Sequence, residues 1–167
     1  ACPSTGWPII AAWMSSTSTR PPKVTVRVPV PVSTIGSVPG VETHSIFFED
    51  RKGARAATDY LIQRGHRRIA CIAGPAVSAN ARERVVGFVE SLTEYGLDYS
   101  QCPILRVGPR TREGYGYDVA MQLLGDAERR PAALVCFNDI VAIGAYKAAH
   151  ELGLRIPDDV SVVGFDD

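Results

Sequence analysis

Polar side chains cluster directly after four apolar segments of this sequence, which end near Ala73, Val107, Phe137 and Phe165. The polar residues are Ser78, Asn80, Arg82, Arg84, Arg110, Asn138, Asp139, Asp166 and Asp167. An Asp or Asn oxygen accepts hydrogen bonds from neighbouring hydroxyl groups, and a guanidinium donates to two oxygens at once. Carboxylates, an amide and guanidinium groups together predict a site for a neutral, polyhydroxylated ligand.

Two aromatic residues, Phe137 and Phe165, come directly before Asn138 and Asp166. We expect their rings to cover the apolar face of a sugar. The resulting set of candidate ligand-binding residues has two groups. The first is Arg84, Asn138 and Asp166, and the second is Ser78, Asn80, Phe137 and Phe165.

The same residue types also have purely structural roles. An Asn or Asp directly before a helix is typical of an N-cap. Arginines at the start of a helix are typical of a solvated face, and two Asp residues after an apolar run fit a turn. The N-cap role applies to Asn138 and Asp139, and the solvated helix face applies to Arg82 and Arg84. The turn applies to Asp166 and Asp167.

Signatures of an enzyme or a metal protein are weak in this sequence. The stretch Gly114-Tyr115-Gly116 lacks the third glycine of a dinucleotide-binding turn, and neither a P-loop nor a G-x-S-x-G turn occurs. The three histidines are isolated, and the four cysteines form no C-x-x-C pair. We therefore expect no catalytic residue, no metal site and no cofactor.

Strand-like and helix-like segments alternate along the chain and would position the polar groups. Nearly all-apolar runs predict buried strands at residues 68–73, 103–107, 132–137 and 160–165. Apolar residues at helical spacing predict helices at residues 51–64, 80–95, 112–124 and 138–152, each followed by a glycine. The pattern indicates an α/β fold, a Rossmann-like parallel sheet with helices on both faces. Ligands bind beyond the carboxyl ends of such strands, where all four polar stretches would meet.

Composition and charge fit a globular protein without a strongly charged surface. Of the 167 residues, 46% are apolar, and 18 Lys and Arg balance 18 Asp and Glu. This balance gives no overall attraction to nucleic acid or to an anionic membrane. No apolar run approaches the roughly 18 residues of a membrane span, and residues 1–18 lack a basic leader. We expect a cytoplasmic protein with no membrane partner.

Residues 1–44 differ from the rest because they are rich in Pro, Ser, Thr and Val. Residues 24–32 alternate like a strand, although Pro29 and Pro31 would exclude it from the centre of a sheet. Residues 33–40 are predicted to form a loop. The chain also ends directly after a predicted strand, so we expect it to be incomplete.

Four stretches carry a combination of motifs that is more specific than any one alone. They are SIFFEDRKGA at 45–54, GARAATDYLIQRGHRRIACIAGP at 53–75, NARERVVGFVESL at 80–92 and ALVCFNDIVAIGAYKAAHELGLRIPDDVSVVGFDD at 133–167. Together they resemble the effector-binding core of the LacI/GalR family of bacterial transcriptional regulators. The resemblance implies two α/β lobes of the periplasmic-binding-protein type, with a ligand in the cleft between them. It also implies that Arg84, Asn138 and Asp166 contact the ligand.

The resemblance further implies how the chain is divided and what it does. Residues 1–44 match the family poorly, residues 45–65 would be a remnant of the N-terminal lobe, and residues 66–167 would be a truncated C-terminal lobe. The implied function is sugar sensing in a homodimeric repressor. Operator DNA would be bound by a helix-turn-helix that this chain does not contain. Alternatives are a periplasmic sugar-binding protein of a transporter and an enzyme on the same fold.

Overall fold

The computed structural model describes residues 33–35, 44–107 and 113–166, which belong to two compact units, Ala1–Phe48 and Glu49–Asp167. In the first unit, strand β1 (Ser33–Ile35) pairs in parallel with strand β2 (His44–Ile46). The prediction of a loop throughout residues 33–40 is therefore wrong at its start. Thr34 and Ile35 are β-branched, which favours an extended backbone. The strand predicted at residues 24–32 lies outside the described residues.

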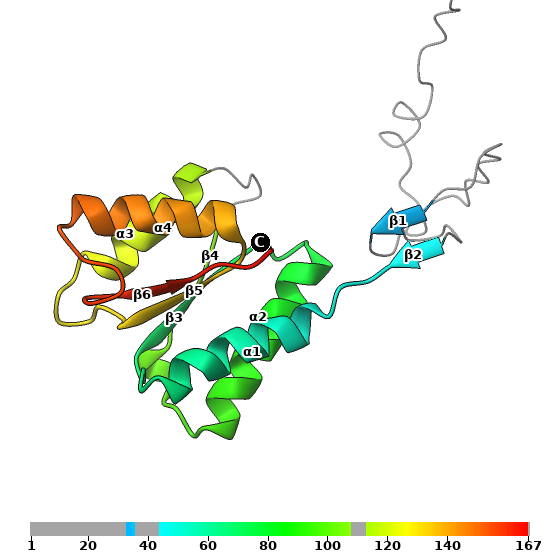
Figure 1. Cartoon of the computed structure of the whole chain (residues 1–167), viewed down its shortest axis with the longest axis horizontal. Coiled ribbons are helices and arrows are strands. Elements are labelled where there is room, and N and C mark those ends of the chain that lie inside the picture. The colour runs from blue at the N-terminus through cyan, green and yellow to red at the C-terminus, as the bar shows by residue number, and fades with distance from the viewer. Residues whose placement is uncertain (1–32, 36–43, 108–112, 167) are drawn as a thin grey trace, which may run out of the picture. The chain divides into compact units, whose positions relative to one another are not determined.

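The second unit alternates strands and helices around one four-stranded sheet (Figure 1). Its elements are α1 (Asp50–Gln63), β3 (Ile69–Ala73), α2 (Ala79–Glu94), a short 3-10 helix (Tyr99–Gln101), β4 (Ile104–Arg106), α3 (Glu113–Leu124), β5 (Ala133–Cys136), α4 (Asp139–Glu151) and β6 (Ser161–Val163). The strand order is β4-β3-β5-β6, and every neighbouring pair is parallel. The predicted parallel α/β sheet is thus confirmed.

Helices cover both faces of this sheet, with α1 and α2 on one face and α3 and α4 on the other (Figure 1). On the first face, Phe88 and Leu92 of α2 pack with Ile69 of β3 in one buried cluster. On the second face, Leu124 of α3 and Val141 of α4 belong to a separate buried cluster. Because strand residues enter both clusters, the strands are apolar on both sides, as their sequences indicated.

Helix α1 belongs to the same compact unit as the sheet, Glu49–Asp167. The assignment of residues 45–65 to an N-terminal lobe stays a prediction. Leu61 and Ile62 of α1 are 2% exposed and share the buried cluster of α2. The two helices approach closely at Gly87, where an added Cβ would lie 2.1 Å from the carbonyl oxygen of Arg51. This contact brings the start of α1 beside the middle of α2.

The glycines that follow the helices behave as predicted at three of four positions. Gly65, Gly96 and Gly153 have φ values of 96°, 62° and 69°, which glycine adopts without a steric penalty. Gly125 instead continues the α3 hydrogen-bonding pattern, since its N–H donates to the carbonyl of Met121.

We predict that Gly87→Ala destabilises the protein by about 1 to 3 kcal/mol, because the methyl group would overlap the backbone of α1. At an unconstrained helix position the same change stabilises by about 1 kcal/mol, so the sign is diagnostic. Urea unfolding of the complete protein measures the effect. Val86→Ala, at the half-exposed neighbouring position, serves as the control. A more stable Gly87→Ala variant would show that the helices are not in close contact.

Candidate functional site

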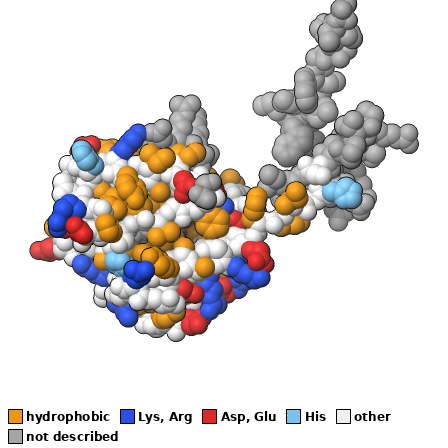
Figure 2. All heavy atoms as spheres, in the orientation of Figure 1, with side chains coloured by type: hydrophobic (Ala, Val, Ile, Leu, Met, Phe, Trp, Pro, Cys, Tyr) orange, Lys and Arg blue, Asp and Glu red, His pale blue; other side chains and the backbone are white. Residues whose placement is uncertain are grey.

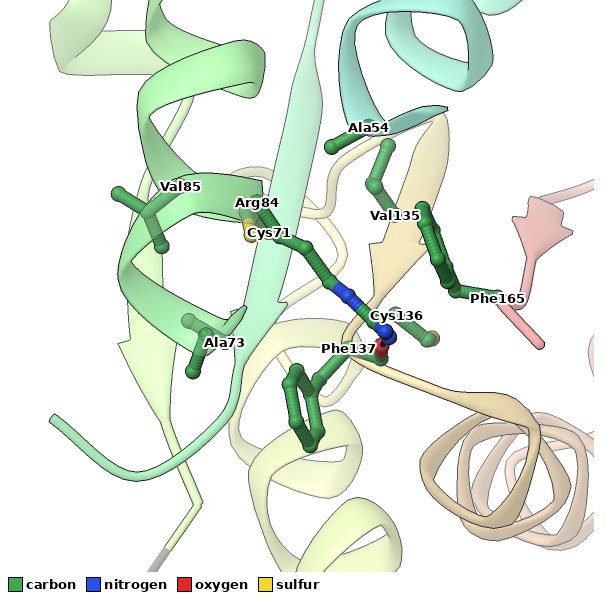
Figure 3. Close-up of a pocket in the computed structure, with 10 residues that line it drawn as sticks. Ala54, Cys71, Ala73, Arg84, Val85, Val135, Cys136, Phe137 and Phe165 are labelled. Atoms are coloured by element: carbon green, nitrogen blue, oxygen red, sulfur yellow. Dashed lines mark hydrogen bonds between the residues drawn. The ribbon is translucent and has the colours of Figure 1, made fainter. Parts of the chain in front are cut away.

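The first turn of α1 and the two loops after β5 and β6 meet at the carboxyl edge of the sheet, and together they surround the guanidinium of Arg84. Arg84 lies on the second turn of α2, Phe137 directly follows β5, and Phe165 follows β6 by two residues. Figure 3 shows the Arg84 side chain extended between the rings of Phe137 and Phe165. Of the residues predicted from strand ends, the structure therefore brings Arg84, Phe137 and Phe165 together at one edge.

The Arg84 guanidinium makes polar contacts with three different segments. Its Nε donates to Oδ1 of Asp50 at 2.7 Å, and its Nη1 donates to the carbonyl oxygen of Phe137. Its Nη2 contacts Oδ1 of Asp166 at 3.3 Å. The side chains of Arg84 and Asp50 are 12% and 7% exposed, whereas that of Asp166 is 55% exposed. The Asp50 contact is therefore buried and structural in character, and the Asp166 contact is open to solvent.

The two phenylalanine rings hold the guanidinium from its faces. The central carbon of the Arg84 guanidinium lies 3.6 Å from the ring centre of Phe165 and 4.9 Å from that of Phe137. Such contacts between a cation and an aromatic face are attractive, more so where water is excluded. Each ring also lies against a glycine: a Cβ on Gly53 would be 2.8 Å from Phe165, and one on Gly74 would be 2.7 Å from Phe137. The rings thus position Arg84, a contact that the sequence did not predict.

Asp50 is a site residue that the sequence reasoning missed. It begins α1 and directly follows an exposed Glu49, whereas the predicted helix began one residue later. Its burial to 6% exposure distinguishes it from Glu49. Burial depends on the close crossing of α1 and α2, which no local pattern in the sequence encodes.

Other candidate residues have structural contacts of their own. Asn138 caps α4, because its side-chain oxygen accepts the N–H of Val141 at 3.0 Å. Ser78 caps α2 in the same way, accepting the N–H of Ala81 at 3.3 Å. These capping bonds use the side-chain oxygens and leave the amide group of Asn138 as a source of donors. Asn80, in the first turn of α2, is half-buried.

Two predicted polar residues, Arg110 and Asp167, lie outside the described part of the chain. Arg82 turns back along its own loop and donates to the carbonyls of Ala76 and Val77. Arg82 therefore has the structural role considered for it above, that of an arginine on the solvated face at the start of a helix.

A shallow cavity of about 400 Å³ opens beside Asp166. It is lined by Gly53, Ala57, Asp139, Gly164, Phe165 and Asp166. The backbone of Asp166 has a φ of 118°, a region that non-glycine residues rarely adopt. Strained backbone of this kind is concentrated at binding and catalytic sites. Arg84 borders this cavity through its contact with Asp166, whereas Asn138 does not line it.

Beneath Arg84, a small pocket is lined by buried groups that include Cys71 and Cys136. Burial raises the pKa of the Cys71 thiol to about 12 and also raises the pKa of Cys136. Both thiols therefore stay protonated at neutral pH and serve as small apolar side chains.

Within the described residues, no group of three or more His, Cys, Asp or Glu side chains is placed to hold a metal ion. Nor is any helix in that part of the chain long and apolar enough to cross a membrane.

A parallel sheet with polar groups gathered at its carboxyl edge is the arrangement at which α/β domains commonly bind small molecules. Residues 58–167 match the model of the periplasmic binding protein-like domain family, and this chain belongs to that family. The HTH-type transcriptional repressor PurR of Erwinia tasmaniensis is 36% identical over 140 residues, which are 84% of this chain and 40% of the repressor. The chain thus spans about two fifths of the length of the curated relatives it matches.

Solved structures give the same result. A regulatory protein of the LacI family from Chloroflexus aggregans superposes with a TM-score of 0.72 at 37% identity, covering 82% of this chain and 49% of that one. A LacI-family regulator from Enterococcus faecium, solved with bound ribose, superposes with a TM-score of 0.67 at 27% identity, covering 75% and 45%. The resemblance to the effector-binding core of LacI/GalR regulators is therefore confirmed.

We predict that Asp50→Ala destabilises the protein by about 2 to 4 kcal/mol, because it leaves the buried Arg84 charge without its closer carboxylate partner. The free energy of unfolding in urea measures this cost. Glu49→Ala is the matched control, since Glu49 pairs with Lys52 on the exposed surface. The control is expected to cost less than about 1 kcal/mol. Equal effects of the two substitutions would contradict the structural role of Asp50.

Proposed function

We propose that this chain is the effector-sensing part of a transcriptional repressor, and that its effector is a sugar or a related small molecule. The proposal rests on one observation above all. Arg84 and Asp166 lie together beside an open cavity at the carboxyl edge of a LacI-type sheet. A fixed donor next to a solvent-exposed acceptor suits vicinal hydroxyl groups, which donate and accept at the same time. The ribose bound to the Enterococcus faecium regulator is consistent with such a ligand.

The site residues are proposed to have distinct roles. Asp166 accepts from a ligand hydroxyl, Arg84 donates to the same or a neighbouring oxygen, and the amide of Asn138 donates from the start of α4. Phe165 provides the apolar wall of the cavity. Ser78, Asn80 and Phe137 support the site from the surrounding loops, and Phe137 does so through Arg84.

Operator DNA is the proposed second partner, bound by a helix-turn-helix elsewhere in the complete protein. Effector binding would shift the equilibrium between open and closed lobes and so change operator affinity. The similarity to repressors favours this function over a transporter's periplasmic sugar-binding protein and over an enzyme. A repressor acts on DNA, so we place the protein in the cytoplasm.

A homodimer is proposed for the complete protein. Helix α4 carries Ile140, Ile143 and Tyr146 one turn apart, and each is 44% to 50% exposed. Figure 2 shows hydrophobic side chains at the surface over α4 and β6. Apolar groups in such a row are typical of an association surface.

We predict that Asp166→Gly weakens effector binding by about 10- to 150-fold, the loss expected for one charge-assisted hydrogen bond of roughly 1.5–3 kcal/mol. Glycine is the chosen replacement because it tolerates the positive φ at this position. Calorimetric titration with uncharged sugars, ribose first, measures affinity, and a gel shift measures operator binding in the same preparation.

Operator affinity without effector is expected to stay near that of the unmodified protein. Asp158→Gly, an exposed position in the loop before β6, is the control for loss of a carboxylate. Unchanged sugar affinity in Asp166→Gly, or loss of operator binding in a folded variant, would contradict the proposed function.

A further inference from the structure

Among the residues that the structure describes, the charged groups that line the cavity beside Asp166 are carboxylates. Its lining includes Asp139 and Asp166, and the remaining lining residues are Gly, Ala and Phe. Arg82 and Arg106 also lie near this edge, but each donates to backbone carbonyls of the loop after β3. Neither of these arginines lines the cavity. An anionic ligand entering it would therefore meet the exposed carboxylate of Asp166.

Within residues 44–107 and 113–166, the cation that borders the cavity is Arg84, and two carboxylates contact it. It contacts the buried carboxylate of Asp50 at 2.7 Å and the exposed carboxylate of Asp166 at 3.3 Å. Its third polar contact is the carbonyl oxygen of Phe137, which also carries partial negative charge. Arg84 can still donate a hydrogen bond to a ligand. However, Arg84, Asp50 and Asp166 together carry no net positive charge that would attract an anion.

Three helices that begin at this edge, α1, α2 and α4, carry polar or acidic side chains of the chain itself at their starts. Helix N-termini attract phosphate and other anions through free N–H groups and the helix dipole. Asp50 lies in the first turn of α1, Ser78 caps α2, and Asn138 and Asp139 fill the first turn of α4. Each of these three helix ends, the usual phosphate sites of α/β folds, thus carries an internal acceptor.

We infer that this site selects effectors without an anionic group and rejects phosphorylated or carboxylated ones, with Asp166 as the determining residue. The inference rests on the proposed function, because it concerns the ligand of the same site. Asp166 determines the selection since it is exposed, faces the cavity, and holds the outer nitrogen of Arg84. Removing its charge would leave Arg84 with a free positive edge toward the cavity.

Inorganic phosphate is the probe that tests this inference in the complete protein. Calorimetric titration at pH 7 compares the unmodified protein with Asp166→Asn and with the matched charge control Asp158→Asn. Asparagine tolerates positive φ better than most residues, so the fold is expected to survive at position 166. Loss of one negative charge within a few ångströms of a bound phosphate predicts about a tenfold or larger gain in phosphate affinity.

The inference requires weak phosphate binding in the unmodified protein and in Asp158→Asn, and the gain in Asp166→Asn alone. Asp139→Asn, the second cavity carboxylate, is expected to change phosphate affinity in the same direction. Submillimolar phosphate binding to the unmodified protein would overturn the inference. An Asp166→Asn variant that is folded by its thermal melt yet no better than Asp158→Asn would overturn it too.

A second titration separates this inference from the proposed function. If ribose 5-phosphate bound more tightly than ribose and changed operator affinity, sensing would stand and the charge selection would be wrong. If no uncharged sugar bound at all while Asp166→Asn still gained phosphate binding, the charge selection would stand and the sugar-sensing function would be contradicted.

Discussion

A buried guanidinium joins the separate parts of this site, and most of the arrangement follows from the need to satisfy it. Arg84 is largely removed from water, and an unpaired charge there would cost several kcal/mol. Asp50 supplies the opposite charge, the Phe137 carbonyl supplies an acceptor, and the ring of Phe165 covers one face. These partners come from α1, from the end of β5 and from the end of β6. Arg84 therefore holds the start of α1 and the loops after β5 and β6 together, and it leaves Asp166 exposed toward the cavity.

Glycine and close helix packing make this arrangement possible. Gly87 allows the backbone of α1 to lie against α2, and that contact carries Asp50 within reach of Arg84. Gly53 and Gly74 leave room for the rings that flank the guanidinium. The lack of a side chain at these three glycines allows the Arg84 guanidinium to be placed accurately. Such pre-organisation is a general requirement of selective binding sites.

Hydrophobic periodicity was enough to predict the strands, the helices and the parallel direction of the strands. The reason is that both faces of the sheet are covered, so its strands are apolar throughout. The strand-end rule then placed Arg84, Asn138 and Asp166 at one edge. Asp50 could not be found in this way, since its burial depends on a tertiary contact between α1 and α2. The rings of Phe137 and Phe165 were predicted to face a sugar, but local sequence does not reveal that an arginine lies between them. For Asn138, the structural alternative is also true, as its side-chain oxygen caps α4.

The coupling between Asp50 and Arg84 holds the site together, and a double-mutant cycle measures it directly. Unfolding free energies of Asp50→Asn, Arg84→Gln and the double variant of the complete protein give the interaction energy of the pair. A coupling of about 2 kcal/mol or more is expected, together with a double variant no less stable than Arg84→Gln alone. Additive effects, within about 0.5 kcal/mol, would mean that the two side chains do not interact and that Arg84 is held in some other way.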